Sequence, residues 1–211
     1  MTSSILPIDW FHRNYSVKRI REIAGQEAPV SLIPLGSQRS KDGPLVEITD
    51  MSGRSWTLMC GAGPLTGVQD VLVATPNPDC LLVVSGGQGY WVPATEPSRY
   101  QAVAAIPIVQ VTKASKDLLL LSTFTTVVAL GAEGRVWESA RVSLDGFSII
   151  SIDATTRSLL GKGFNPHVSS DGFFRLSLDA GIVTLLREGE EGLDQGERPA
   201  EALAGAALFV H

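Results

Sequence analysis

The sequence predicts an all-β protein built from antiparallel meanders. Short apolar runs at 118–122 and 126–130 are rich in Leu, Val and Thr, which is typical of strands buried on both faces. Glycine-containing turns separate such runs along most of the chain, as at 131–134 and at Asp145-Gly146. A turn followed by an aromatic residue also recurs, which indicates internal repetition.

This recurrence favours propeller-like repeats. Gly-Arg-x-Trp occurs at 53–56 and at 134–137, with looser copies at 86–92 and at 179–183, the last without its aromatic residue. Turn glycines are expected at 53, 89, 134 and 181, so the steps are 36, 45 and 47 residues. Steps of about 40–45 residues with four strands per unit are typical of propeller blades. A β-sandwich or an open barrel satisfies the same local signals and stays open as the alternative.

The first region, residues 1–36, is expected to be a helical or extended segment packed on the core. Asn14 or Ser16 could cap a short helix that Gly25 would end. The apolar face of this helix would hold Val17, Ile20 and Ile23. Its basic face could bind a membrane surface or an acidic partner, but a solvated face on a docked helix explains it more simply.

Residues 37–186 form the expected β domain. Strand-like runs before the stretch at 118–130 occur at 45–49, 56–60, 68–74, 81–85, 90–92 and 103–111. Two prolines within 75–79 mark a turn, and Pro107 interrupts the run at 103–111. Residues 187–211 are the third region, an acidic, flexible segment followed by an apolar tail. That tail could pack back as a short helix or strand, or pair with another chain.

Composition sets the broad class. The chain has 211 residues, of which 44% are hydrophobic and 18% charged, so one domain with a sizeable core is expected. The net charge of −5 argues against a nucleic-acid partner, since such domains are normally basic. No apolar run is long enough to cross a bilayer and no signal-peptide pattern opens the chain, so we expect no membrane association and a cytoplasmic location. Cys60 and Cys80 are expected to be buried hydrophobic residues.

No motif in the sequence predicts catalysis, a cofactor or a metal. His12, His167 and His211 are far apart, and neither cysteine belongs to a Cys-x-x-Cys pair. The glycine-rich stretch at 86–89 lacks the Lys-Ser/Thr of a phosphate-binding loop and is better explained as a hairpin turn. We therefore expect no catalytic, cofactor-binding or metal-binding residues, and a chain that is not an enzyme.

One segment resembles a pattern found in uncharacterised bacterial β-rich proteins. Residues 137–146 match Trp-x-Ser-x-Arg-x-Ser-x-Asp-Gly, and 174–181 are similar to the hairpin that closes those domains, with Ser177-Leu178-Asp179 in place of their Val-Asp-Leu register. The similarity covers about the last half of the chain. It implies a bacterial, cytosolic, all-β domain and carries no known activity, so it assigns no functional residue.

The function expected from these observations is protein binding without catalysis. One version is a bacterial immunity or defence-accessory protein that masks a basic partner. The expected partner-binding residues are Tyr90, Trp91, Arg99, Tyr100, Glu188, Glu190 and Glu191. Two alternatives stay open: a small-ligand binder or enzyme whose site is built from the loops at 86–91, 95–100 and 161–167, and a structural subunit of a homo-oligomer.

Overall fold

The computed structural model describes residues 8–20, 30–34, 43–68, 70–165, 170–186 and 206–207. Within these residues the protein is all-β, and its helical content is one short 3₁₀ turn, η2 (Pro97–Arg99). The chain divides into two compact units, one ending at Ile108 and the other running from Val109 to Ala207. The expected β domain of 37–186 spans both units.

Sheet I, the first sheet of the first unit, has the strand order β1-β3-β4-β2. Its strands are β1 (Tyr15–Arg19), β2 (Val30–Ile33), β3 (Leu45–Asp50) and β4 (Ser55–Cys60). β3 and β4 form an antiparallel hairpin, β1 adds antiparallel to β3, and β2 adds parallel to β4.

Sheet II is a meander in which strand order follows chain order. It comprises β5 (Val71–Ala74), β6 (Cys80–Ser85), β7 (Gln88–Pro93) and β8 (Gln101–Ala102). Every residue of β5 and β6 is buried. At the β5 edge, Ile8 forms a parallel bridge with Val73, so the N-terminal segment covers that edge.

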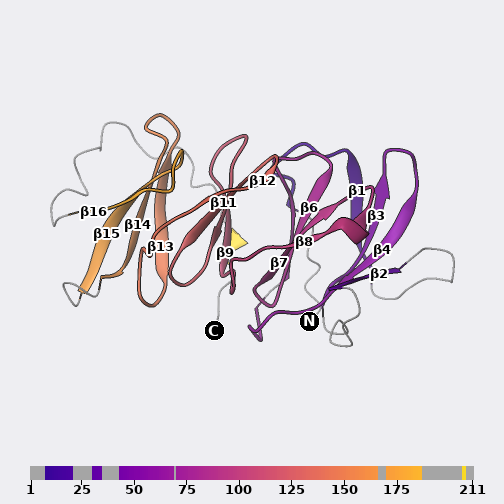
Figure 1. Cartoon of the computed structure of the whole chain (residues 1–211), viewed down its shortest axis with the longest axis horizontal. Coiled ribbons are helices and arrows are strands. Elements are labelled where there is room, and N and C mark those ends of the chain that lie inside the picture. The colour runs from indigo at the N-terminus through magenta and orange to yellow at the C-terminus, as the bar shows by residue number, and fades with distance from the viewer. Residues whose placement is uncertain are drawn as a thin grey trace. The chain divides into compact units, whose positions relative to one another are not determined.

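The core of the first unit lies between sheets I and II. One cluster joins Ile48, Trp56 and Leu58 of sheet I to Leu81 and Val83 of sheet II. The Tyr15 hydroxyl of β1 donates a buried hydrogen bond of 3.0 Å to the Cys80 carbonyl of β6. Figure 1 shows the strands of these two sheets as neighbouring layers. Alternating side chains of the two sheets therefore fill one sandwich-like core.

The second unit also contains two sheets. Sheet III has the order β12-β11-β10-β9-β17, and sheet IV is the meander β13-β14-β15-β16. The strands of sheet III are β9 (Gln110–Lys113), β10 (Leu119–Ser122), β11 (Val127–Gly131), β12 (Gly134–Glu138) and β17 (Ala206–Ala207). Those of sheet IV are β13 (Phe147–Asp153), β14 (Ser158–Asn165), β15 (Ser170–Ser177) and β16 (Val183–Leu185).

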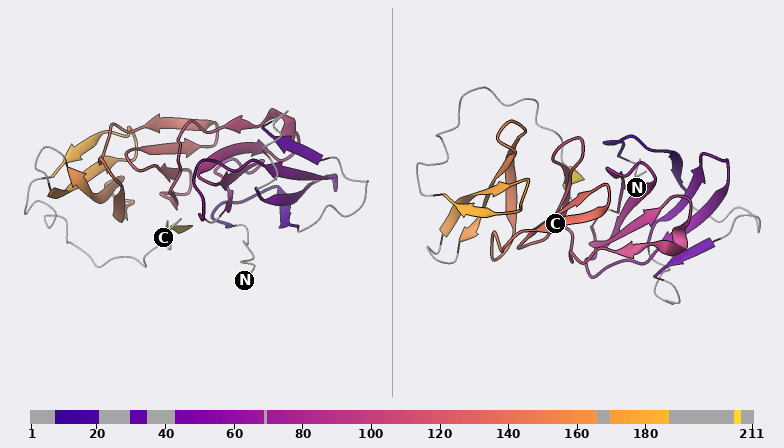
Figure 2. Two further views of the ribbon diagram at one scale, coloured as in Figure 1. Left: turned by 90° about the horizontal axis from the view of Figure 1, so that it is seen from below. Right: turned by 45° about the horizontal axis from the view of Figure 1, so that its top comes forward.

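The core of the second unit joins sheets III and IV. Leu120, Ala129 and Trp137 belong to the same buried cluster as Leu159 and Phe174. The Phe174 ring meets Phe147 edge to face, with centroids 5.6 Å apart. Figure 2 shows the paired sheets of each unit from two further directions. Within the C-terminal tail, β17 pairs with β9 of the same chain, so at these residues the tail packs back as a strand.

The strands of sheets II, III and IV begin at regular intervals along the chain. The second strands of sheets II, III and IV begin at Cys80, Leu119 and Ser158, which are 39 residues apart in both steps (119 minus 80 and 158 minus 119). Gly53, Gly134 and Gly181 adopt positive φ in hairpin turns, as expected. The expectation for Gly89 is wrong: it lies inside β7, and the turn uses Gly86 and Gly87.

The expected N-terminal helix is also wrong where the structure describes it. Residues 15–19 form β1, whose backbone pairs with β3 from Tyr15↔Asp50 to Arg19↔Val46. The spacing of apolar residues suited a helix, but pairing with a distant strand outweighs local propensity. The expected end of the helix, Glu22 to Gly25, lies outside the described residues. The strand expected at 103–111 is likewise reduced to the start of β9 at Gln110.

Candidate functional site

Two of the expected partner-binding residues, Tyr90 and Trp91, lie in the interior. Both are buried on β7. The Tyr90 hydroxyl donates to the Gly61 carbonyl at 3.1 Å, and burial, with smaller effects of Cys60 and Tyr100, raises the pKa of Tyr90 to about 12. Both aromatic rings are buried in the free chain and are not accessible to a partner. This placement therefore does not support surface contact at these two residues.

The next two expected residues lie at the surface beside β7. Arg99 ends η2, and its exposed guanidinium is 3.6 Å from the Glu96 carboxylate. Tyr100 is partly buried and meets Tyr90 edge to face at 6.2 Å. Glu188, Glu190 and Glu191 lie outside the described residues. Among the members of the expected set that the structure describes, Arg99 and the outer part of Tyr100 are therefore the accessible ones.

Three exposed apolar side chains of the second unit, which sequence reasoning did not identify, lie on segments that are joined through the backbone. Phe124, Leu144 and Phe164 are 37%, 41% and 36% exposed. They come from the β10–β11 turn, the segment between β12 and β13, and the end of β14. Backbone hydrogen bonds join these segments: Leu144 N–H donates to the Phe164 carbonyl at 3.3 Å, and Gly146 N–H donates to the Phe124 carbonyl at 2.9 Å. We call these three side chains the apolar edge.

Polar contacts hold the backbone of the apolar edge in place. The Thr123 hydroxyl accepts hydrogen bonds from the N–H groups of Thr125 and Thr126, which fixes the turn that presents Phe124. The Val142 N–H donates to the Thr125 carbonyl at 2.8 Å. The Ser143 hydroxyl donates to the Phe164 carbonyl at 3.3 Å. Phe124 and Leu144 thus lie in ordered connecting segments and Phe164 near the end of β14, and no local pattern in the sequence marks the three residues as exposed.

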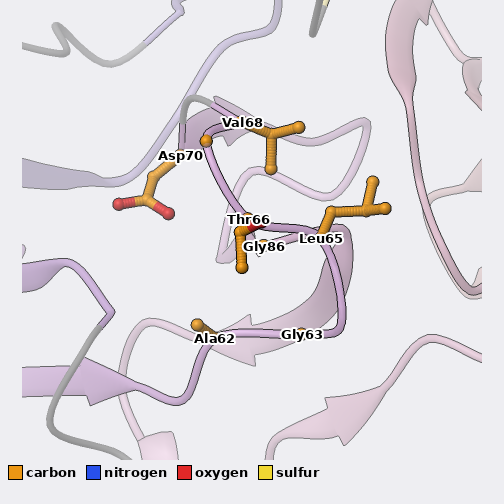
Figure 3. Close-up of a pocket in the computed structure, with 8 residues that line it drawn as sticks. Ala62, Gly63, Leu65, Thr66, Val68, Asp70 and Gly86 are labelled. Carbon is orange, nitrogen blue, oxygen red and sulfur yellow. The ribbon is translucent and has the colours of Figure 1, made fainter. Parts of the chain in front are cut away.

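The first unit contains a hollow of about 620 Å³ beside the loop that joins sheet I to sheet II. Figure 3 shows this loop running from Ala62 through Leu65 to Val68, with the Asp70 carboxylate and the Leu65 side chain pointing to opposite sides. The lining residues are Ala62, Gly63, Leu65, Thr66, Gly67, Val68, Asp70 and Gly86. Asp70 is the charged residue among them, and Gly86 comes from the glycine-rich stretch noted in the sequence.

Asp70 lies in a partly desolvated position. Burial raises the pKa of its carboxyl, and the Ser85 hydroxyl, Arg19 and the Gly86 backbone oppose that effect. The Arg19 guanidinium on β1 is 3.9 Å from the carboxylate, a long ion pair. The Ser85 hydroxyl is fully buried and makes no hydrogen bond of ordinary geometry within the described part of the chain. The hollow is therefore lined by one partly buried carboxylate, which already has Arg19 as an ion-pair partner.

Neither a metal-ion site nor a membrane-spanning helix occurs among the described residues. Among those residues, no group of three or more His, Cys, Asp and Glu side chains is arranged to hold a metal ion. No helix in the same residues is long and apolar enough to span a membrane. Cys60 and Cys80 are buried, and no disulfide joins them, as expected.

No protein-family model matches the chain, and no curated protein matches it. Among solved structures, the N-terminal domain of Nup159 is similar at 14% identity and a TM-score of 0.35, over 88% of this chain and 54% of that one. The chain spans about half the length of that structure, and a similarity at this TM-score carries no argument about function.

Proposed function

We propose that this protein is a non-enzymatic module that binds another protein through the apolar edge. The observation that supports the proposal is that Phe124, Leu144 and Phe164, each more than a third exposed, lie on three segments that backbone hydrogen bonds join. Single exposed apolar residues are normal on protein surfaces, whereas grouped ones mark interaction sites. Ordered turns also lower the entropic cost of binding, because the contact residues are already positioned.

The binding free energy that the apolar edge can contribute suits the centre of a larger interface. Fully burying a Phe or Leu side chain contributes roughly 1.5–3 kcal/mol. The three side chains are already more than half buried in the free chain, so each would contribute about 1 kcal/mol when covered. A partner must therefore also contact the surrounding polar surface, as in ordinary interfaces with an apolar centre and a polar rim.

The architecture in this proposal is a set of propeller-like repeats, one per sheet. The constant spacing of 39 residues between the second strands of sheets II, III and IV supports it. Chain-order strands in sheets II and IV, and in β9 to β12 of sheet III, support it as well. An experimental structure with a different strand order in these sheets would contradict the repeat, and one with the same order would support it.

A narrower version of the proposal is an immunity or defence-accessory role in a bacterial cytosol. The support is the net charge of −5, which suits a basic partner. Association would then slow as ionic strength rises, because salt screens the attraction between the two proteins. Salt-independent association rates would argue against a basic partner while leaving binding at the apolar edge intact.

The experiment that tests the main proposal is affinity purification from the native host with matched variants. We expect the natural chain to recover a stoichiometric partner. The variant F124S/L144S should lose it, because both substitutions remove apolar contact area. The control variant M51S/I182S changes two apolar residues in other turns that are more exposed than Phe124 and Leu144. This variant should retain the partner. Retention by both variants, or loss by both with intact folding, would contradict the assignment of the surface.

The solution mass of the purified chain distinguishes the oligomer alternative. A monomer whose partner is a different protein agrees with the proposal. A stable homo-oligomer that dissociates in F124S/L144S would instead identify the apolar edge as a self-association surface.

A further inference from the structure

We propose that Asp145 is a site of covalent self-modification, at which the aspartate isomerises to a β-aspartyl residue without an enzyme. The reacting step is Asp145-Gly146, in the segment between β12 and β13. Asp145 is exposed, and Gly146 has a φ of +79°. The proposal concerns the chemistry of this step and does not depend on the proposed partner.

The reaction needs only these two residues and water. The Gly146 nitrogen attacks Cγ of the Asp145 carboxyl group in its acid form. The bond from Cγ to the hydroxyl oxygen breaks, and one water molecule leaves with the amide proton. Water then adds to the main-chain carbonyl carbon of Asp145 in the succinimide ring and breaks its bond to the Gly146 nitrogen. The main chain now runs through Cβ and Cγ, so it is one methylene longer at unchanged mass.

The Asp145 carboxylate is free to reach the attacking nitrogen. Among the residues that the structure describes, it makes no hydrogen bond and no ion pair. Every other described aspartate is held by such a contact, as Asp50 is by Ser52 and Asp153 by Thr156. An exposed side chain without a partner changes rotamer on the picosecond-to-nanosecond timescale, so Cγ repeatedly approaches the nitrogen. Glycine at the second position adds no side chain that would shield that nitrogen.

One main-chain contact opposes the reaction. The Gly146 N–H donates to the Phe124 carbonyl at 2.9 Å, so this hydrogen bond must open before the nitrogen can attack. Gly146 precedes β13, whose pairing with β14 begins at Phe147↔Gly163. The opening is therefore local and leaves the strand pairs of sheet IV in place.

The Asp171-Gly172 step is an internal control for the effect of the fold. Asp171 is also exposed, but its carboxylate is 3.3 Å from the Lys162 ammonium. Both residues of this step lie in β15 and pair with β14. Ring closure there must break the ion pair and turn the main chain out of the extended geometry of a paired strand. A phenylalanine follows both steps, so the neighbouring sequence is nearly the same and the fold distinguishes them.

The modification would act on the apolar edge. The Leu144 N–H donates to the Phe164 carbonyl, and the Gly146 N–H donates to the Phe124 carbonyl. Asp145 therefore lies between two main-chain contacts that join the segments of the edge. An extra methylene between these donors prevents both contacts from keeping their geometry. Slow loss of partner binding is the expected consequence, and this consequence rests on the proposed function.

The test incubates the folded, full-length chain in ¹⁸O-labelled water at neutral pH. Each ring opening inserts one labelled oxygen, and electron-transfer fragmentation of the digested chain identifies β-aspartyl residues by position. Label and β-aspartyl product at Asp145 should accumulate at least fivefold faster than at Asp171. In the urea-unfolded chain the two steps should react at rates within twofold of each other. A third Asp-Gly step, at 42–43, does not enter the comparison because Asp42 lies outside the described residues.

Two variants test the route. Asp145→Glu should abolish the product at position 145, because the same attack would have to close a six-membered ring. Gly146→Ala should slow the reaction several-fold, because a methyl group shields the nitrogen. A Cβ atom at position 146 meets no other atom within 4 Å, so the variant has room for the methyl group. Circular dichroism of both variants checks that they fold like the natural chain.

Equal rates at Asp145 and Asp171 in the folded chain would overturn the proposal, as would labelling at Asp145 no greater than at position 145 of Asp145→Glu. Partner recovery tests the consequence separately. Fresh natural chain and fresh Asp145→Glu should recover the partner equally, and after ageing the natural chain should recover less. Equal recovery after ageing would contradict the effect on the apolar edge. Failure of both fresh chains would contradict the proposed function, while the labelling result would still decide whether Asp145 isomerises.

Discussion

The indole ring of Trp137 lies against the backbone of Gly181 in the second unit. A Cβ atom at position 181 would lie 2.6 Å from Cε3 of the indole, and Gly181 has a φ of +68°. The indole N–H donates a buried hydrogen bond of 2.9 Å to the Leu178 carbonyl. A tryptophan of sheet III thus packs on the β15–β16 turn of sheet IV, and glycine leaves the space that its ring occupies.

Gly181→Ala is expected to destabilise the protein by about 2–4 kcal/mol, because a positive φ and an overlap with the indole add together. Gly53→Ala is the matched control. Gly53 has a φ of +82° but open space around its Cα, so only the conformational cost of about 1 kcal/mol applies. Urea unfolding of both variants measures the difference, and equal losses would show that the indole is not tightly packed at Gly181.

Trp137→Phe is expected to cost roughly 1–3 kcal/mol more than Trp56→Phe, because only the first change leaves a buried carbonyl without its donor. Trp56 is equally buried on β4, but its indole N–H has no hydrogen-bond partner among the described residues. Both substitutions remove similar volume, so their difference isolates the hydrogen bond. Guanidinium unfolding followed by circular dichroism would measure it, and a larger loss at Trp56 would contradict the assignment.

The β3–β4 turn should contribute to acid sensitivity through Asp50. Its carboxylate accepts hydrogen bonds from the side chain and backbone of Ser52 and pairs with Arg54 at 2.8 Å, and these contacts lower the pKa of Asp50 to about 2. The folded state therefore binds this proton less tightly than the unfolded chain, whose Asp pKa is about 3.9. The resulting stability is present above pH ~4 and is lost as the pH falls towards 2.

Asp50→Asn should accordingly lower stability at neutral pH and flatten the acid limb of the stability curve between pH ~4 and ~2. Asp145→Asn, a change at the exposed Asp-Gly turn, provides the comparison. Thermal unfolding across this pH range gives the measurement. An unchanged acid limb in Asp50→Asn would mean that the Asp50 network forms equally in the unfolded chain.

Both cysteines should be unreactive in the folded protein. Burial, with a smaller effect of nearby Asp70, raises the pKa of the Cys60 thiol, and Cys80 is buried at the start of β6. The thiolate is the reactive species, so mildly alkaline iodoacetamide should label neither residue until denaturant is added. Mass spectrometry of intact protein counts the modified thiols. Rapid native labelling of Cys60 would show that sheets I and II separate readily.

Strands buried on both faces could be predicted because such strands consist of continuous apolar residues, whatever surrounds them in the fold. Continuous apolar runs mark β6, β10 and β11, and all three are buried along their whole length. Turns could be predicted equally well where a glycine must adopt positive φ, as at Gly53 and Gly134. The N-terminal strand was missed because β1 owes its conformation to pairing with β3, about 30 residues further along the chain.

The candidate sites lay beyond sequence reasoning for a related reason. Asp70 and Ser85 are 15 residues apart (85 minus 70), and their environment depends on a loop held by Gly63 and Gly86. Tyr90 and Trp91 seemed suited to a surface, yet the folded sheet buries both. Phe124, Leu144 and Phe164 gave no local sign of exposure, since identical residues elsewhere fill the core.

The sequence by itself determined the all-β class and most of the hairpin turns. Each of these depends on backbone preference and on neighbours within a few residues, which composition and spacing record directly. Only the tertiary structure decided which apolar side chains are covered, which aromatic ring meets which glycine, and where a carboxylate is desolvated. Burial and pKa depend on atoms brought together from distant parts of the chain, and no local pattern in the sequence encodes that proximity.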